Sequence, residues 1–208
     1  MEAKDFIDSY WNYYIELENK LIRSQHYVAF HKRNNATFSN EYIELLQVIC
    51  SEIDVVGKII ARHFNPAFVA DKYTHINKWG FEVQQYLPLI QSVEVVFRFG
   101  YELKPWEKWI YTKNMQNRIV LDQSKKAESP FWWIAYNKVK HERTSIGVGK
   151  LPNYMRANQK CVIYALAALY VLEKHMLDEF SVNEDIFYEP SHLFRIKMLN
   201  YYIKNNDK

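Results

Sequence analysis

Four stretches of the chain repeat apolar residues at intervals of three and four positions, the spacing that places side chains on one face of an α-helix. They cover residues 4–30, 41–64, 129–143 and 153–180. Polar residues alternate with the apolar ones, so each stretch predicts an amphipathic helix that buries one face. Residues 74–90 show a weaker form of the same pattern, which Pro88 interrupts.

The pattern changes between residues 92 and 104. β-branched and aromatic residues follow one another closely there, with Gly100 among them, which predicts a strand or a small hairpin inserted between helices. Pro105–Trp109 predicts an aromatic-packed turn, and residues 110–128 predict a loop with extended structure near Ile119–Leu121. The tail after Ser181 is polar. Its apolar residues are expected to dock back as a strand or a short helix: Leu193, Phe194, Ile196, Met198 and Leu199.

These elements predict a mainly α fold, an antiparallel helical bundle in one domain that spans residues 1–208. The hairpin near residues 92–104 belongs to an insertion of about residues 92–125, and residues 181–208 form the tail. Only 5 glycines and 6 prolines are present, too few for a fold of many short strands. Aromatic residues make up 16% of the chain, which predicts a core rich in large rings.

Charge and cysteine usage narrow the class of protein. The formal net charge of +3 is weakly basic and far below that of a dedicated nucleic-acid binder. Cys50 and Cys161 lie in apolar segments and are expected to be buried free thiols. The amino-terminal residues lack the apolar core of a secretory signal, and the longest apolar run, residues 161–172, is too short for a membrane span. We therefore expect a cytoplasmic protein without a membrane partner.

The spacing of residues supports neither a metal site nor a phosphate-binding loop. The seven histidines do not form a His-Glu-x-x-His pair and do not lie at zinc-ligand spacing from a cysteine, so we expect no metal site and no cofactor. Residues 147–150, Gly-Val-Gly-Lys, lack the full spacing of a phosphate-binding loop and follow no buried strand. They are interpreted as a loop between two helices.

The segment from Ser129 to Arg143 carries the most chemical information. Ser129 is a good cap and Pro130 suits the first helical position. Helical spacing puts Trp132, Ala135, Tyr136 and Val139 on a buried stripe, with Trp133, Asn137 and Lys140 beside it.

One edge of this helix combines several chemical groups. Asn137 and His141 are four positions apart, so their side chains are expected to meet. The edge thus offers an amide, an imidazole and the cations Lys140 and Arg143 next to aromatic rings, a set suited to phosphodiester chemistry. The same spacing also fits a plain interhelical contact with solvated cations.

Residues 136–143, Tyr-Asn-Lys-Val-Lys-His-Glu-Arg, follow Trp132-Trp133 and precede an Ala- and Leu-rich helix. This region resembles HEPN domains, an all-α superfamily, in an uncharacterised prokaryotic branch. The resemblance covers about residues 129–175. The family motif is an arginine, a polar residue that is often Asn, three variable residues and a histidine. Asn137 and His141 match the last two, whereas Tyr136 takes the arginine position.

The resemblance implies an HEPN-like helical bundle, a homodimer and RNA as a possible substrate, with a metal-independent site where two protomers meet. It implies catalytic roles for His141, Asn137 and Lys140. Lys140 lies one turn from Tyr136 and would replace the missing cation. Contacts to phosphate or RNA would come from four further residues of the segment: Arg143, Lys138, Trp133 and Tyr136.

Three functions remain open. The first is binding of RNA, a nucleotide or a partner protein without catalysis, which the missing arginine favours. The second is a metal-independent endoribonuclease of a prokaryotic antiviral defence or toxin system, with His141 as general acid and base. The third is a structural or assembly protein, in which the small residues of the helix at 153–180 serve an interface.

Overall fold

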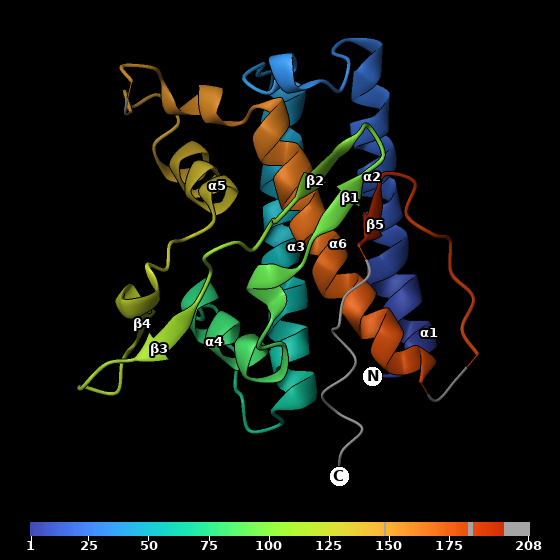
Figure 1. Cartoon of the computed structure of the whole chain (residues 1–208), viewed down its shortest axis with the longest axis vertical. Helices are drawn as coiled ribbons and strands as arrows, with labels where there is room; N and C mark the ends of the chain where they lie inside the picture. The colour runs from blue at the N-terminus through green and yellow to red at the C-terminus, as the bar shows by residue number, and fades with distance from the viewer. Residues whose placement is uncertain (148, 183–184, 198–208) are drawn as a thin grey trace.

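The computed structural model describes residues 1–147, 149–182 and 185–197 (Figure 1). It is mainly helical, as the sequence predicts, with short antiparallel strands. The helices of the amino-terminal half are α1 (Ala3–Phe6), a π-helical turn (Ile7–Trp11), α2 (Asn12–Arg23), α3 (Asn40–Phe64) and α4 (Ile76–Tyr86). The second half holds α5 (Phe131–His141) and α6 (Gln159–Ser181). The strands are β1 (Val95–Phe97), β2 (Tyr101–Leu103), β3 (Tyr111–Lys113), β4 (Ile119–Leu121) and β5 (Phe194–Ile196).

Helices α3 and α6 lie side by side at the centre and run in the same direction (Figure 1). The sequence predicts an antiparallel bundle, and α2 does run opposite to both, but this central pair departs from the prediction. The reason is a backbone pairing just before the two helices: Gln159 N–H donates to the Thr37 carbonyl at 2.9 Å and Lys160 N–H to the Asn35 carbonyl at 3.1 Å. Both helices therefore start at the same end of the molecule.

A group of four indole rings, the tryptophan cluster of Trp79, Trp106, Trp109 and Trp132, connects the helices. All four rings are fully buried, and the Trp106 and Trp109 centroids are 4.2 Å apart. Each buried N–H has an acceptor, including Ala168 O on α6 for Trp106 and Pro105 O for Trp132. The predicted aromatic turn at residues 105–109 is thus confirmed, and its rings hold α5 against α4 and α6.

Strands β1 and β2 form the predicted hairpin, with Val95 opposite Leu103 and Phe97 opposite Tyr101. β5 adds a third strand beside β1, with Phe97 opposite Phe194. The docking predicted for the tail is therefore confirmed as a strand, whereas Met198 and Leu199 lie outside the described residues. Within residues 110–128 the extended structure predicted near Ile119–Leu121 is confirmed as β4, and β4 pairs with β3 in a second hairpin that was not predicted.

The carboxylate of Glu18 on α2 fixes the segment that leads into β5. It is fully buried and accepts hydrogen bonds from the Ser191 hydroxyl and from the backbone N–H groups of His192 and Leu193, the last at 3.1 Å. The Tyr14 hydroxyl donates to it as well, at 2.7 Å. Several donors can hold a buried carboxylate in place without a cation, because each compensates part of the lost hydration.

Glu173 on α6 is a buried carboxyl group in a different situation. Both of its oxygens are inaccessible to water and have no hydrogen-bond partner among the described residues. Burial, together with the nearby carboxyl of Glu52, raises the pKa of Glu173 well above 4.5. The folded chain therefore keeps a proton that the unfolded chain releases, and this difference makes the fold less stable as the pH rises above about 4.5.

Replacing the carboxyl of Glu173 tests whether this group is buried and protonated in the folded chain. We expect Glu173→Gln to be more stable than the parent chain at pH 7, by about 1–3 kcal/mol, because the variant has no proton to take up on folding. The advantage should shrink toward pH 4.5, where the unfolded parent is also protonated. Urea denaturation of both proteins across this range measures the difference. A difference independent of pH would contradict a buried protonated carboxyl.

A second titrating group, His175, does not affect the comparison between Glu173→Gln and the parent chain. Burial lowers the pKa of His175 to about 4, so protonation of the unfolded chain weakens the fold as the pH falls below 6.5. That contribution is common to both proteins and cancels in their difference.

Candidate nucleic-acid interface

Helix α5 presents its residues largely as its spacing predicts. The stripe of Trp132, Ala135, Tyr136 and Val139 is buried, and His141 lies exposed on the opposite face. The helix ends at His141 and not at Arg143. Its cap is Pro130 without a side-chain hydrogen bond, so the predicted capping role of Ser129 is wrong by one position.

Tyr136, which occupies the motif arginine position, belongs to the core. Only 7% of its surface is exposed, so little of its ring is open to a base, and the contact of Tyr136 with RNA stays a prediction. Lys140 covers its remaining edge: the Lys140 ammonium donates to the Tyr136 hydroxyl at 3.1 Å and lies 5.3 Å from the ring centroid. A cation is therefore held one turn along α5 from Tyr136.

Asn137 and His141 do not form the expected pair. The Asn137 amide donates to the backbone carbonyl of Trp133 at 3.0 Å, and among the hydrogen bonds of the described residues none joins it to His141. The imidazole is open to solvent at the end of the helix. Asn137 thus does not orient it, which removes the positioning role that the sequence predicts for this amide.

The remaining predicted contact residues, two cations and an indole, have different surroundings. Lys138 forms an ion pair with Glu142, with 2.9 Å between Nζ and Oε2, and 43% of the Lys138 side chain is exposed. Its charge is therefore partly neutralised. Trp133 is half-buried against Tyr136. Arg143 lies past the helix and is exposed, and no ion pair among the described residues includes its guanidinium.

The loop between α5 and α6, residues 142–158, is held by hydrogen bonds between its two arms. Asn153 is the centre: its buried amide donates to the Glu142 carbonyl at 3.0 Å and accepts from Arg156 Nε at 2.9 Å. Gly147 packs directly on this pair, because a β-carbon there would lie 2.6 Å from Asn153 Oδ1. The interpretation of residues 147–150 as an interhelical loop is confirmed, with Val148 outside the described residues.

Positive charge concentrates in this part of the chain. Residues 138–160 contain six Lys and Arg side chains against the single carboxylate of Glu142, a net charge of +5 in a chain whose total is +3. The remainder is therefore slightly acidic. We name the surface of Lys140, His141, Arg143, Lys150 and Arg156 the basic face. Lys150 and Arg156 were missed at the sequence level, although a count of charge along the chain would have found them.

The ends of two helices add to this potential. α3 and α6 both begin beside the loop, since residues 35–37 pair with residues 159–160. The first N–H groups of α6 are paired with the Thr37 and Asn35 carbonyls and with the Asn158 side chain, so the contribution is that of two helix dipoles whose positive ends point the same way. The parallel arrangement of the central helices therefore strengthens the basic face.

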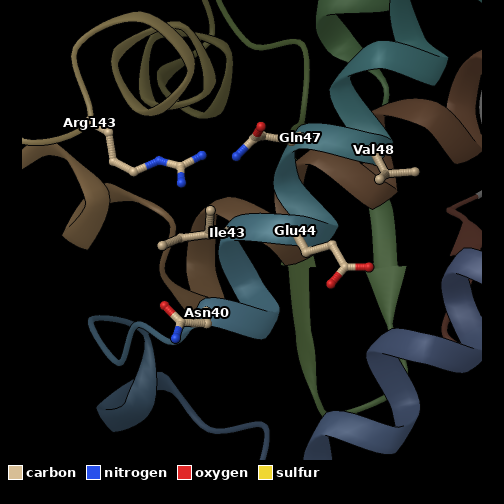
Figure 2. Close-up of a pocket in the computed structure, with 6 residues that line it drawn as sticks. All are labelled: Asn40, Ile43, Glu44, Gln47, Val48 and Arg143. Atoms are coloured by element: carbon tan, nitrogen blue, oxygen red, sulfur yellow. The ribbon is translucent and has the colours of Figure 1, made fainter.

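A pocket of about 360 Å³ opens between Arg143 and the first turns of α3 (Figure 2). Its other lining residues, none of which was predicted as a site residue, all come from α3: Asn40, Ile43, Glu44, Gln47 and Val48. The three polar side chains among them, Asn40, Glu44 and Gln47, recur at helical spacing, and this pattern is visible in the sequence. What the sequence does not show is that the loop carries Arg143 over them.

A second cleft, of about 660 Å³, lies on the other flank of α5, beside Phe131 and Ile134. Two of its three lysines are neutralised: Lys104 pairs with Glu94 at 2.8 Å and Lys108 with Glu128 at 3.3 Å, whereas the Lys160 ammonium lies 4.7 Å from the Phe131 ring centroid. The cleft is larger than the pocket at Arg143, but its lining includes neither Arg143 nor Lys150.

Comparison with known proteins identifies no family, so a function has to be inferred from the geometry of the site. No family model matches the chain, and no curated protein or solved structure is detectably similar to it. The described ranges contain no cluster of three or more His, Cys, Asp or Glu residues that could hold a metal ion. Within the same ranges, no helix has the length and apolarity needed to cross a membrane.

The structure of the loop makes a testable prediction. Asn153→Ala leaves the Glu142 carbonyl and the Arg156 guanidinium without their partner, so we expect a loss of about 1–3 kcal/mol in stability. Hydrogen exchange should become faster in residues 143–156 and stay unchanged in α2. The exposed Asn12→Ala is the matched control. If exchange in the loop were the same in both variants, Asn153 would not be the centre of its structure.

Proposed function

We propose that this protein binds RNA through the basic face and does not cleave it. The observation that carries the proposal is the segregation of charge: residues 138–160 hold a net +5, while the rest of the chain is slightly acidic. Such a concentration, next to two helix starts, attracts a polyanion more strongly than the total charge suggests.

The side chains on this surface suit a phosphate backbone. Arg143 and Lys150 are exposed, and the Lys140 ammonium is held in a defined position by the Tyr136 hydroxyl. Fixed cations lose little conformational freedom when they bind phosphate. The half-buried indole of Trp133 lies on the same side of α5 as Lys140 and offers an edge for a neighbouring base.

The proposal favours binding over cleavage because two of the three motif positions have other tasks. Tyr136 is buried, and the Asn137 amide is engaged by the Trp133 carbonyl. His141 alone is accessible, and an unassisted imidazole supplies one proton transfer without a group to orient it. The resemblance of residues 129–175 to HEPN domains supports RNA as the ligand and adds a homodimer with an HEPN-like bundle to the proposal.

Salt dependence provides the test. We expect Lys140→Gln and Arg143→Gln each to weaken RNA binding severalfold, and each to reduce the slope of log K against log salt concentration by roughly 0.7. Lys4→Gln, which removes the same charge from α1 at the opposite end of the molecule (Figure 1), should change neither quantity. Fluorescence anisotropy with a labelled RNA between 50 and 300 mM salt, roughly the useful range, measures both.

Three results would contradict the proposal. Binding that ignores salt, or that responds equally to Lys4→Gln, would argue against contacts between phosphates and the basic face. RNA cleavage in EDTA that yields cyclic-phosphate ends and disappears in His141→Ala would replace the proposal with the endoribonuclease alternative. A dimer that binds no RNA would favour the assembly alternative.

A further inference from the structure

The exposed side of α3 next to the loop carries three polar side chains on one stripe. Asn40, Glu44 and Gln47 follow one another at intervals of four and three residues, which stacks them along the helix surface. The aliphatic side chains of Ile43 and Val48, both half-buried, line the pocket beside them. The polar stripe thus lies between two aliphatic side chains, Ile43 on one side and Val48 on the other (Figure 2).

Arg143 completes this pocket from the loop. Figure 2 shows its guanidinium and the Gln47 amide pointing toward one another, with Ile43 close to both. Arg143 is kept there by the loop backbone, since its carbonyl accepts a hydrogen bond from Tyr154 N–H at 3.0 Å. In the part of the chain that the structure describes, no hydrogen bond or ion pair occupies the Gln47 amide or the Arg143 guanidinium. Both remain available to a ligand.

The chemistry of the pocket fits a nucleobase better than a phosphate. A planar guanidinium stacks on rings, a carboxamide both donates to and accepts from a base edge, and aliphatic side chains cover a base face. The carboxylate of Glu44, which also lines the pocket but points away from Arg143 (Figure 2), repels phosphate oxygens. RNA phosphates are therefore expected to contact the neighbouring cations, and a base is expected to occupy the pocket.

Base pairing restricts the ligand further. The pocket, about 360 Å³ and open to solvent, has room for one ring system. A base in a duplex is stacked and paired, so it must leave its partner to enter. We propose that the pocket formed by α3 and Arg143 binds one unpaired base of a single-stranded RNA; this rests on the proposed RNA binding at the basic face.

The test separates base contact from phosphate contact. A short RNA of mixed sequence is titrated as a single strand and as a perfect duplex. We expect the single strand to bind at least about tenfold more tightly to the parent chain, and Gln47→Met to lower its affinity about tenfold, the effect of one lost base contact. The salt slope should not change, because Gln47 carries no charge. The duplex affinity should also stay the same.

Two further variants sharpen the result. Arg143→Lys keeps the charge but loses the planar group, so it should preserve the salt slope and weaken single-strand binding. Gln85→Met replaces an exposed glutamine of α4, far along the chain from the pocket, and should leave binding unchanged. Thermal unfolding of each variant confirms that the surface substitutions leave the fold intact.

The two proposals fail in different ways. If the parent chain bound neither form of the RNA, the proposed function would be wrong. If it bound both forms equally, or if Gln47→Met and Gln85→Met behaved alike while Lys140→Gln still reduced the salt slope, RNA binding would stand. The base pocket would then be wrong.

Discussion

The parallel contact between α3 and α6 determines the rest of the architecture. Their starts are locked together by the backbone hydrogen bonds from residues 35–37 to residues 159–160, and the buried Gln159 amide adds a bond to the Ala29 carbonyl at 3.1 Å. Small residues on α6, among them Ala165 and Ala168, are fully buried. Because the two helices start together, the α5–α6 loop must return to the start of α3, where its cations gather.

The same constraint separates the tasks of α5. One side of this helix is fixed through Trp132 to the tryptophan cluster, and Tyr136 continues that buried side. A tyrosine suits a position half in the core, since its hydroxyl reaches the surface and meets Lys140. An arginine there would place a cation against buried rings. A tyrosine at this position therefore has a packing reason.

Local patterns in the sequence predicted the helices, the hairpin at residues 92–104 and the turn of Trp106 and Trp109, since each depends on neighbouring residues. Contacts between distant segments were not predictable. The parallel α3–α6 pair depends on hydrogen bonds across more than 120 positions of chain, and β5 on a strand of another segment. For the candidate site, the exposure of His141 and Lys140 followed from helical spacing. The engagement of Asn137 by its own helix and the placement of Arg143 over α3 did not.

The buried carboxylate of Glu18 has a consequence for biosynthesis. Its donors come from residues 191–193, and the Trp11 indole likewise donates to the Glu189 carbonyl at 2.7 Å. A nascent chain emerging from the ribosome presents α2 long before these partners exist, so the aromatic face of this helix must wait with its acid group hydrated. Native packing of α2 is therefore completed only after residues 189–193 have been synthesised.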